Sequence, residues 1–97
     1  MALTHYKVAV NTTPIKVVTA GNADDGTYVY LANESGTTDI YLGDNTVTTS
    51  DGYLLVKQNG STIAYRQQFT LYSGDSLWAV ASSNANLQVL ISGVVQD

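Results

Sequence analysis

Cysteine is absent from the 97-residue chain, and histidine occurs once, at position 5. Without cysteine there is no disulfide framework and no thiolate ligand for zinc, a usage that fits folding in a cytoplasmic compartment. Acid–base and nucleophilic catalysis usually employ a His, Cys or Lys, or paired carboxylates held in a pocket. Because His5 lies near the start of the chain, the sequence predicts a protein that is not an enzyme and that holds no cofactor.

Positive charge is also scarce, with four Lys and Arg residues against eight Asp and Glu and a net charge of −4. Nucleic-acid binding depends on several cations that neutralise phosphates, so we expect no nucleic-acid partner. No apolar run approaches the roughly 18 residues of a membrane span. The first residues, Met1 to His5, lack the basic and apolar regions of a secretion signal. We therefore expect neither export by that route nor a membrane location.

Thr, Val, Tyr, Ser and Asn are abundant, which is the usage of strands and turns and not of helices. Apolar and polar residues alternate with the period of two that strands require, and turn signals recur at short intervals. The predicted fold is an all-β antiparallel β-sandwich, a single domain of seven or eight strands with under about 10% helix. The expected strands cover residues 6–10, 15–19, 27–33, 40–43, 53–56, 67–72, 77–82 and 87–92.

Alternation assigns one side of each expected strand to the core. Around Leu77 and Trp78 both alternations are apolar, so the pattern alone does not decide which of the two points inward. We place Leu77 in the core. The predicted inward residues are Val8, Val10, Val17, Val29, Leu31, Ile40, Leu42, Val47, Leu54, Phe69, Leu71, Leu77, Leu87, Val89 and Ile91.

Most aspartates lie beside Gly or Asn in turn signals, where Asp usually binds the backbone, and we interpret them as turn residues. The alternatives are a catalytic pair of carboxylates and a calcium site, which takes several oxygen ligands. Asp24-Asp25-Gly26 lacks the alternating spacing of a calcium loop. No metal site is predicted. The aspartates considered are Asp24, Asp25, Asp39, Asp44, Asp51 and Asp75.

Tyrosine is plentiful, with seven copies. Tyr28, Tyr30 and Tyr41 fall on the sides of their strands opposite the aliphatic residues, and Trp78 does likewise if Leu77 points inward. A face of exposed rings favours a protein contact, because Tyr and Trp contribute much of the binding energy at interfaces. Ordinary cross-strand pairing of rings and stacking against a sugar are the alternatives.

Residues 1–6 precede the first clear alternation, so we expect an N-terminal arm over 1–6 that is disordered on its own, and a β-sandwich domain over 7–97. With its apolar Leu3 and Tyr6, such an arm is suited to add a strand to a neighbouring chain or to anchor on it. The predicted protein-contact residues are Leu3, Tyr6, Tyr28, Tyr30, Tyr41 and Trp78.

Three runs together form a recognisable pattern: IYLGDNTVTTSDGYLL at residues 40–55, FTLYSGDSLWAVAS at 69–82 and LQVLISG at 87–93. This pattern resembles the small β-sandwich head decoration, or capsid cement, proteins of tailed bacteriophages, especially phages of actinobacteria. Its most specific points are Val47-Thr48, Gly52 and the run GDSLW at 74–78. The segment from Lys57 to Gln67 is longer and more polar than the corresponding link of that pattern.

The resemblance implies a structural virion protein, made in the host cytoplasm, that binds the outer surface of the capsid and stabilises it. Its implied partners are the major capsid protein and other copies of itself. Near a local threefold axis we expect a homotrimer, with the arm on the capsid side and the aromatic face between or beneath subunits. Similar domains occur in tail and fibre proteins, so a role there in assembly or receptor binding is an alternative, and a carbohydrate-binding module is another.

Overall fold

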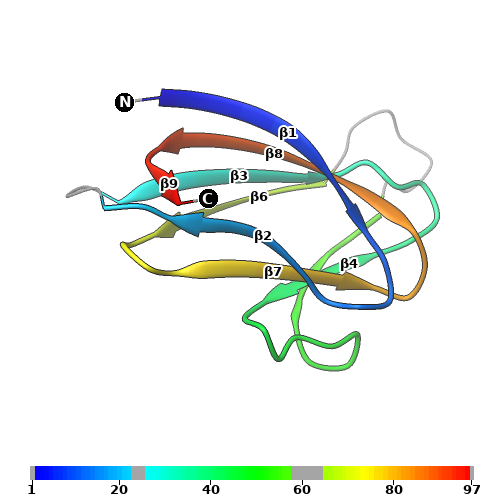
Figure 1. Ribbon diagram of the computed structural model, residues 1–97. Helices are drawn as coiled ribbons and strands as arrows, with labels where there is room; N and C mark the ends of the chain where they lie inside the picture. Colours follow the sequence, from blue (N-terminus) through cyan, green and yellow to red (C-terminus); the bar gives the residue numbers. More distant parts are fainter. Residues whose placement is uncertain (1, 23–25, 58–64, 97) are drawn as a thin grey trace.

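The computed structural model describes residues 2–22, 26–57 and 65–96. Over these residues two antiparallel sheets face each other (Figure 1). The four-stranded sheet has the order β1-β8-β3-β6, and the five-stranded sheet has the order β5-β4-β7-β2-β9. The strands are β1 (Ala2–Val10), β2 (Ile15–Ala20), β3 (Thr27–Asn33), β4 (Ile40–Gly43), β5 (Tyr53–Leu55), β6 (Tyr65–Leu71), β7 (Ser76–Ala81), β8 (Ala85–Gly93) and β9 (Val95–Gln96).

The predicted all-β antiparallel sandwich is confirmed, but the described ranges contain nine strands instead of seven or eight. The additional strand is β9, which pairs with β2 after the chain has left β8 at Gly93. Gly93 has a φ of +140°, and an added Cβ would lie 3.0 Å from the Cα atom of Thr27. Glycine therefore allows the chain to pass from one sheet to the other at this point. The described residues include no helix, and hence none able to span a membrane.

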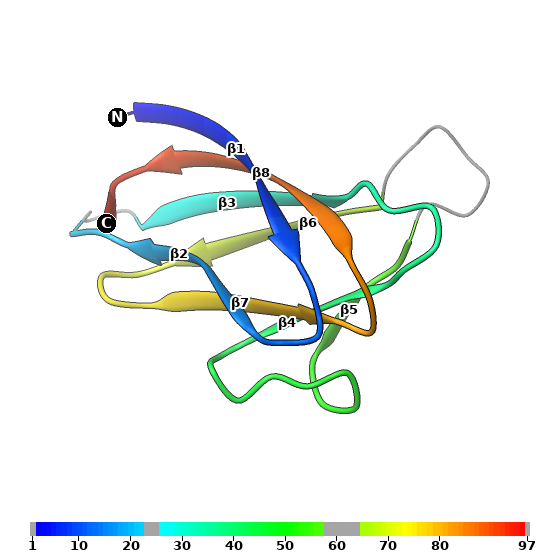
Figure 2. The same cartoon turned by 45° about the vertical axis from the view of Figure 1, so that its right-hand side comes forward.

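Figure 2 shows the backbones of the two facing sheets. The core lies between these sheets and takes one side of each long strand. Leu77 is buried in it, so Trp78 points outward, as predicted. Val8, Phe69 and Leu71 are partly buried against the core. The predicted inward residues that are buried in this core are Val10, Val17, Val29, Leu31, Ile40, Leu42, Leu77, Leu87, Val89 and Ile91.

The prediction for β5 is wrong, because Leu54 is 45% exposed whereas Leu55 is buried. In the pairing of β5 with β4, Leu55 lies opposite the buried Ile40, and Leu54 lies opposite Tyr41. Both sides of this short strand are apolar, so alternation within it carries no information about which side faces the core. The register with β4 decides the question.

Asn33 ends β3 and fixes the crossing of the chain from the four-stranded to the five-stranded sheet. Its buried Nδ2 donates to the carbonyls of Thr38 and Leu55, both at 3.0 Å. Its Oδ1 accepts from the N–H of Ser35 at 2.9 Å. Because Leu55 belongs to β5, one buried amide with paired polar atoms ties the two sheets together.

The start of the chain belongs to the four-stranded sheet. β1 and β8 pair from Ala2 opposite Gly93 to Val10 opposite Ala85. Residues 2–6 are therefore strand and not the free tail expected for an arm over residues 1–6; Met1 lies outside the described residues. The pairing reaches this far because β8 is as long as β1, nine residues, and offers partners to the whole of it.

Candidate functional site

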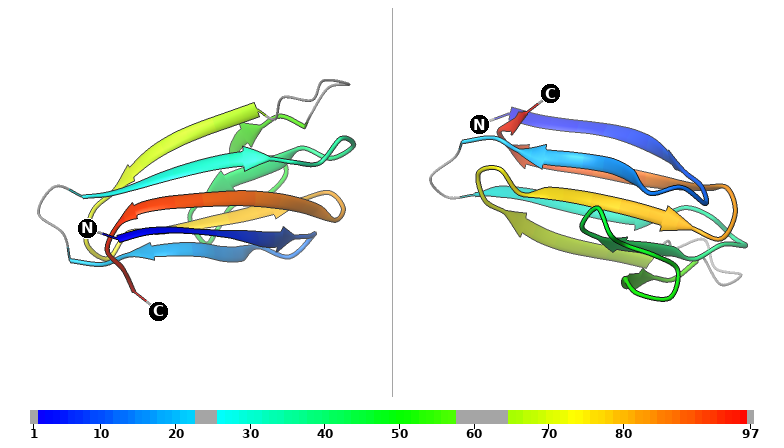
Figure 3. Two further views of the ribbon diagram at one scale, coloured as in Figure 1. Left: turned by 90° about the horizontal axis from the view of Figure 1, so that it is seen from above. Right: turned by 60° about the horizontal axis from the view of Figure 1, so that its bottom comes forward.

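The four strands of the four-stranded sheet lie side by side in Figure 3, left. Their register places a row of side chains across the outer face of this sheet. His5 of β1 pairs with Leu90 of β8, Leu90 pairs with Tyr30 of β3, and Tyr30 pairs with Gln68 of β6. The residue after Tyr30 is the buried Leu31, so side chains in the row point away from the core.

This row lines one side of an open groove of about 710 Å³, and Ala32 and Gln88, which pair in the next row, line the other side. Its centre is apolar, with Tyr30 40% exposed and Leu90 38% exposed. Polar side chains flank the centre: His5 and Gln68 lie at the two ends of the row, and Gln88 lies beside the row on β8. The described residues that line the groove include no Asp, Glu, Lys or Arg. Ligand pockets span roughly 300–1,000 Å³, so the groove has the size of a binding site.

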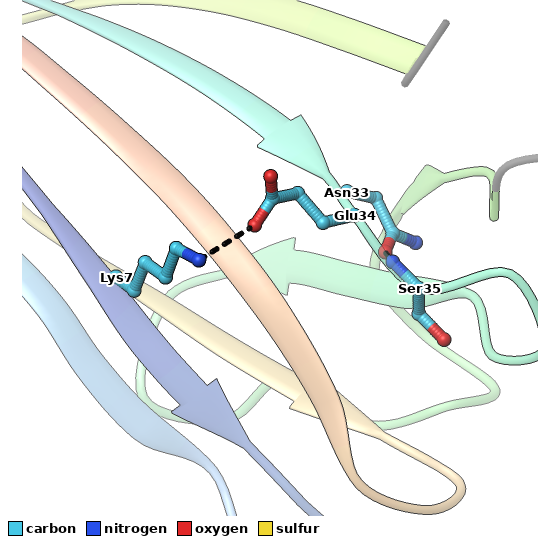
Figure 4. Close-up of polar contacts among 4 residues, drawn as sticks. All are labelled: Lys7, Asn33, Glu34 and Ser35. Carbon is cyan, nitrogen blue, oxygen red and sulfur yellow. Dashed lines mark hydrogen bonds and ion pairs between the residues drawn. The ribbon is translucent and has the colours of Figure 1, made fainter. Parts of the chain in front are cut away.

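An ion pair lies beyond the Gln88 side of the groove. The Nζ atom of Lys7 is 3.6 Å from Oε1 of Glu34, and Figure 4 shows the lysine reaching across β8 to the glutamate. Lys7 pairs with Gln88 in the sheet, and the N–H of Glu34 donates to the carbonyl of Asn86 at 3.1 Å. Both charged side chains are exposed, so the pair adds little stability. It does give Lys7 a counter-charge, and the surroundings of the groove gain no net charge from it.

A second candidate surface, the terminal end, lies where β1 begins and β9 ends (Figure 1). Leu3 is 73% exposed there, and Tyr72, in the turn after β6, is 59% exposed. An added Cβ at Gly26 would lie 3.3 Å from the ring of Tyr72, which places this ring beside the start of β3. The terminal end consists of the exposed apolar residues Leu3, Tyr72, Val94 and Val95.

Hydrogen bonds join the segments that carry the terminal end. The carbonyl of Val94 accepts from the N–H of Gly21 at 2.7 Å and from Oγ1 of Thr27 at 2.8 Å. The N–H of Gly74 donates to the carbonyl of Ala20 at 3.1 Å, so the turn after β6 is tied to β2. The exposed apolar side chains therefore sit on a hydrogen-bonded scaffold.

The residues of the predicted aromatic face lie on two opposite sides of the sandwich. Tyr28 and Tyr30 point outward from β3 in the four-stranded sheet, and Leu3 of β1 shares their side. Tyr41 of β4 and Trp78 of β7 point outward from the five-stranded sheet and are half-buried. Each ring lies opposite the aliphatic residues of its own strand, as predicted. The single aromatic face is wrong, because β3 and β4 belong to different sheets.

The segment 44–52 lies over part of the outer face of the five-stranded sheet, next to β4 (Figure 3, right). Val47 in this segment is buried, and an added Cβ at Gly43 would lie 3.2 Å from its side chain. At Gly52 an added Cβ would lie 2.7 Å from Val47 Cγ2 and 3.0 Å from Tyr41 Cβ. Val47 is thus buried as predicted, but in a second cluster outside the main core. This covered patch consists of Tyr41, Val47, Trp78 and Val80.

Tyr6 points toward the opposite sheet and not toward solvent. Its hydroxyl donates to the carbonyl of Val17 at 2.8 Å, and its ring packs against the core. Burial raises the pKa of the Tyr6 phenol. This predicted contact residue therefore links β1 of one sheet to β2 of the other.

Three aspartates bind backbone groups, as the turn interpretation predicts. Asp39 and Asp75 accept from backbone N–H groups at 2.8 and 2.9 Å. Asp44 accepts from the hydroxyl and the N–H of Thr46, and these bonds lower the pKa of its carboxyl. Residues 24–25 lie outside the described residues. Within the described ranges, no three His, Asp or Glu side chains come together as metal ligands.

Sequence reasoning identified Tyr30 but missed its neighbours Gln68, Gln88 and Leu90. Alternation already pointed Gln68 outward, opposite Phe69; the missing information was that β8 lies between β1 and β3. The register of four strands, and no single motif, defines the groove.

No family model matches this chain, and neither a curated protein nor a solved structure matches it.

Proposed function

We propose that this chain is a structural virion protein that binds the outer surface of a bacteriophage capsid and stabilises it, without catalysing a reaction. The observation that carries the proposal is the terminal end, where Leu3, Tyr72, Val94 and Val95 expose apolar side chains on a hydrogen-bonded scaffold. Exposed apolar surface of this kind marks contact sites for other macromolecules. The resemblance of residues 40–55 and 69–82 to capsid decoration proteins supports the capsid as the partner.

The shape of the domain supports binding in several copies. The described structure measures 38 × 29 × 18 Å, and the terminal end occupies one end of it. We infer that a contact confined to one end of so small a domain buries less than the roughly 1,200 Å² of a stable interface and that one copy therefore binds weakly. Copies joined in a homotrimer on the major capsid protein bind together and gain avidity.

The location is tested by immunogold electron microscopy of tailed-phage particles from a lysate of the strain that carries the gene. Antibody raised against the purified chain is expected to label the heads. Label over the tails would instead support the alternative role in tail or fibre assembly or receptor binding. Particles without label would overturn the assignment to a virion.

The docking surface is tested by co-sedimentation of the purified chain with capsids that lack this protein. Tyr72→Ala is expected to lower the affinity at least tenfold, or about 1.4 kcal/mol, because the exposed ring leaves the interface. Tyr30→Ala is the matched control, since it removes a similarly exposed ring from the groove, and it is expected to bind as the wild type does. Wild-type binding by Tyr72→Ala would contradict docking through the terminal end.

A further inference from the structure

We propose that the groove on the outer face of the four-stranded sheet binds a neutral oligosaccharide. The groove and the terminal end share no residue, although Leu3 of the terminal end lies on the same outer face as the groove. The inference therefore goes beyond the proposed capsid role and does not depend on it.

The order of side chains in the central row matches the two-sided chemistry of a sugar. Across β1, β8, β3 and β6 the row reads His5, Leu90, Tyr30 and Gln68, with a polar group at each end and apolar groups between them. A pyranose ring presents an apolar C–H face, which packs on an exposed aromatic ring, and a rim of hydroxyl groups. Tyr30, 40% exposed, provides the ring.

The polar groups around the centre suit hydroxyls. The amide of Gln68 and that of Gln88 each both donate and accept hydrogen bonds, as a sugar hydroxyl does. The two ring nitrogens of His5 also offer hydrogen-bonding positions to sugar hydroxyls. The described residues that line the groove include no Asp, Glu, Lys or Arg, so these residues offer no counter-charge to phosphate, sulfate or carboxylate groups.

The dimensions fit more than one sugar ring. Neighbouring strands lie about 4.8 Å apart, so the three spacings from β1 to β6 separate the backbones of His5 and Gln68 by about 14 Å. The groove volume of about 710 Å³ also exceeds what one monosaccharide fills. We therefore expect a chain of two or three rings that crosses the strands.

An extended peptide fits the groove less well. β8 and β3 form its floor, and both are interior strands with neighbours on each side. Their backbone groups are engaged in the sheet, so a peptide cannot add to it as a strand there. The N–H and C=O groups of a buried peptide would need other partners, and the groove offers mainly the few side chains named above.

The test is binding of the purified chain to an array of neutral oligosaccharides of glucose, galactose, mannose, rhamnose and N-acetylhexosamines, with sulfated and sialylated members included. Binding to one or more neutral members is expected, with a Kd of about 1 mM or tighter in a following titration. Amide NMR shifts on titration are expected at residues 30, 68, 88 and 90. Binding to none of them, or to charged members only, would overturn the proposal.

Variants connect the binding to the groove. Tyr30→Ala is expected to lower the affinity for the bound neutral sugar at least tenfold, and Tyr30→Trp to keep it, because the stacking ring remains. Gln88→Leu, similar in shape without the amide, is expected to weaken binding severalfold. Tyr72→Ala is the matched control at the terminal end and is expected to bind as the wild type does.

Three results would reject the site. Wild-type sugar affinity in Tyr30→Ala, or its loss in Tyr72→Ala, would place the sugar elsewhere. A change of oligomeric state in Tyr30→Ala, measured by analytical ultracentrifugation, would assign the groove to a contact between copies. Co-sedimentation with capsids tests the capsid role, and sugar binding tests the groove. Either proposal can therefore fail while the other stands.

Discussion

The two outer faces of the sandwich arise from the same alternation of residues along the strands, but their outward aliphatic side chains differ in exposure to solvent. On the four-stranded sheet Leu90 is 38% exposed in the open groove, whereas on the five-stranded sheet Val80 is 3% exposed. On the five-stranded side the connection between β4 and β5 folds back and places Val47 near Gly43 and Gly52, and Gly52 lies beside Tyr41, the strand neighbour of Val80. An outward side chain thus becomes part of a small core or of a binding surface according to where a loop folds back.

The strongest test of this comparison removes a side chain from each face. Val47→Ala deletes two buried methyl groups and should lower the free energy of unfolding by about 2 kcal/mol. Leu90→Ala, on the open face, should change it by no more than about 0.5 kcal/mol. Urea unfolding measures both values. In folded Val47→Ala the fluorescence emission of Trp78, which lies in the covered patch, should shift to longer wavelength. Equal losses of unfolding free energy in the two variants would contradict the difference between the two faces.

A smaller effect is expected at Tyr6, which joins the edge of the open-faced sheet to the covered one. Tyr6→Phe should cost about 1 kcal/mol near neutral pH, because the hydrogen bond to Val17 is lost. Burial raises the pKa of Tyr6 in the folded state above the unfolded value of about 10. Its contribution is therefore complete below pH 10 and is lost as the pH rises through the folded pKa.

The measurement is the free energy of unfolding between pH 7 and about pH 11, within the range where tyrosine titrates. The wild type should lose stability more steeply with rising pH than Tyr6→Phe. Parallel curves for the two proteins would show that the phenol is not protected in the folded state.

The smallest effect is expected at Asp44, at the start of the covering segment. Hydrogen bonds from the side chain and the N–H of Thr46 lower the pKa of the exposed Asp44 carboxyl. Its contribution is present above the unfolded pKa of about 3.9 and is lost as the pH falls through the folded value. Asp44→Asn should therefore flatten the acid limb of the stability curve and leave the neutral range nearly unchanged. An unaltered acid limb would contradict this role.

Most of the fold follows from the sequence, since alternation is a local property. It gives the strands, and it gives the inward side wherever only one side is apolar, as at Val29 and Leu31. It gives no answer for Leu54 and Leu55, where both sides are apolar, nor for β9, which is two residues long. In these places pairing with a distant strand decides.

The site is less predictable for the same reason. Tyr30 and Tyr41 look alike in sequence, each between buried aliphatic residues, yet they lie on opposite faces. The row from His5 to Gln68 exists only because β8 inserts between β1 and β3. Alternation in the expected strand 67–72 does point Tyr72 away from Phe69 and Leu71, but Val94 lies between two strands, where alternation says nothing about exposure.

The long ladder between β1 and β8 also determines when the chain can fold. Val10, at the end of β1, has its partner at Ala85, and every other pair of this ladder is more distant in sequence. β1 therefore leaves the ribosome well before β8 and has no partner strand until residues 85–93 have been synthesised. Until then its nine residues carry one cation, Lys7, and no proline. Such an unpaired strand is prone to associate with others of its kind, so fast completion of synthesis protects the yield of folded protein.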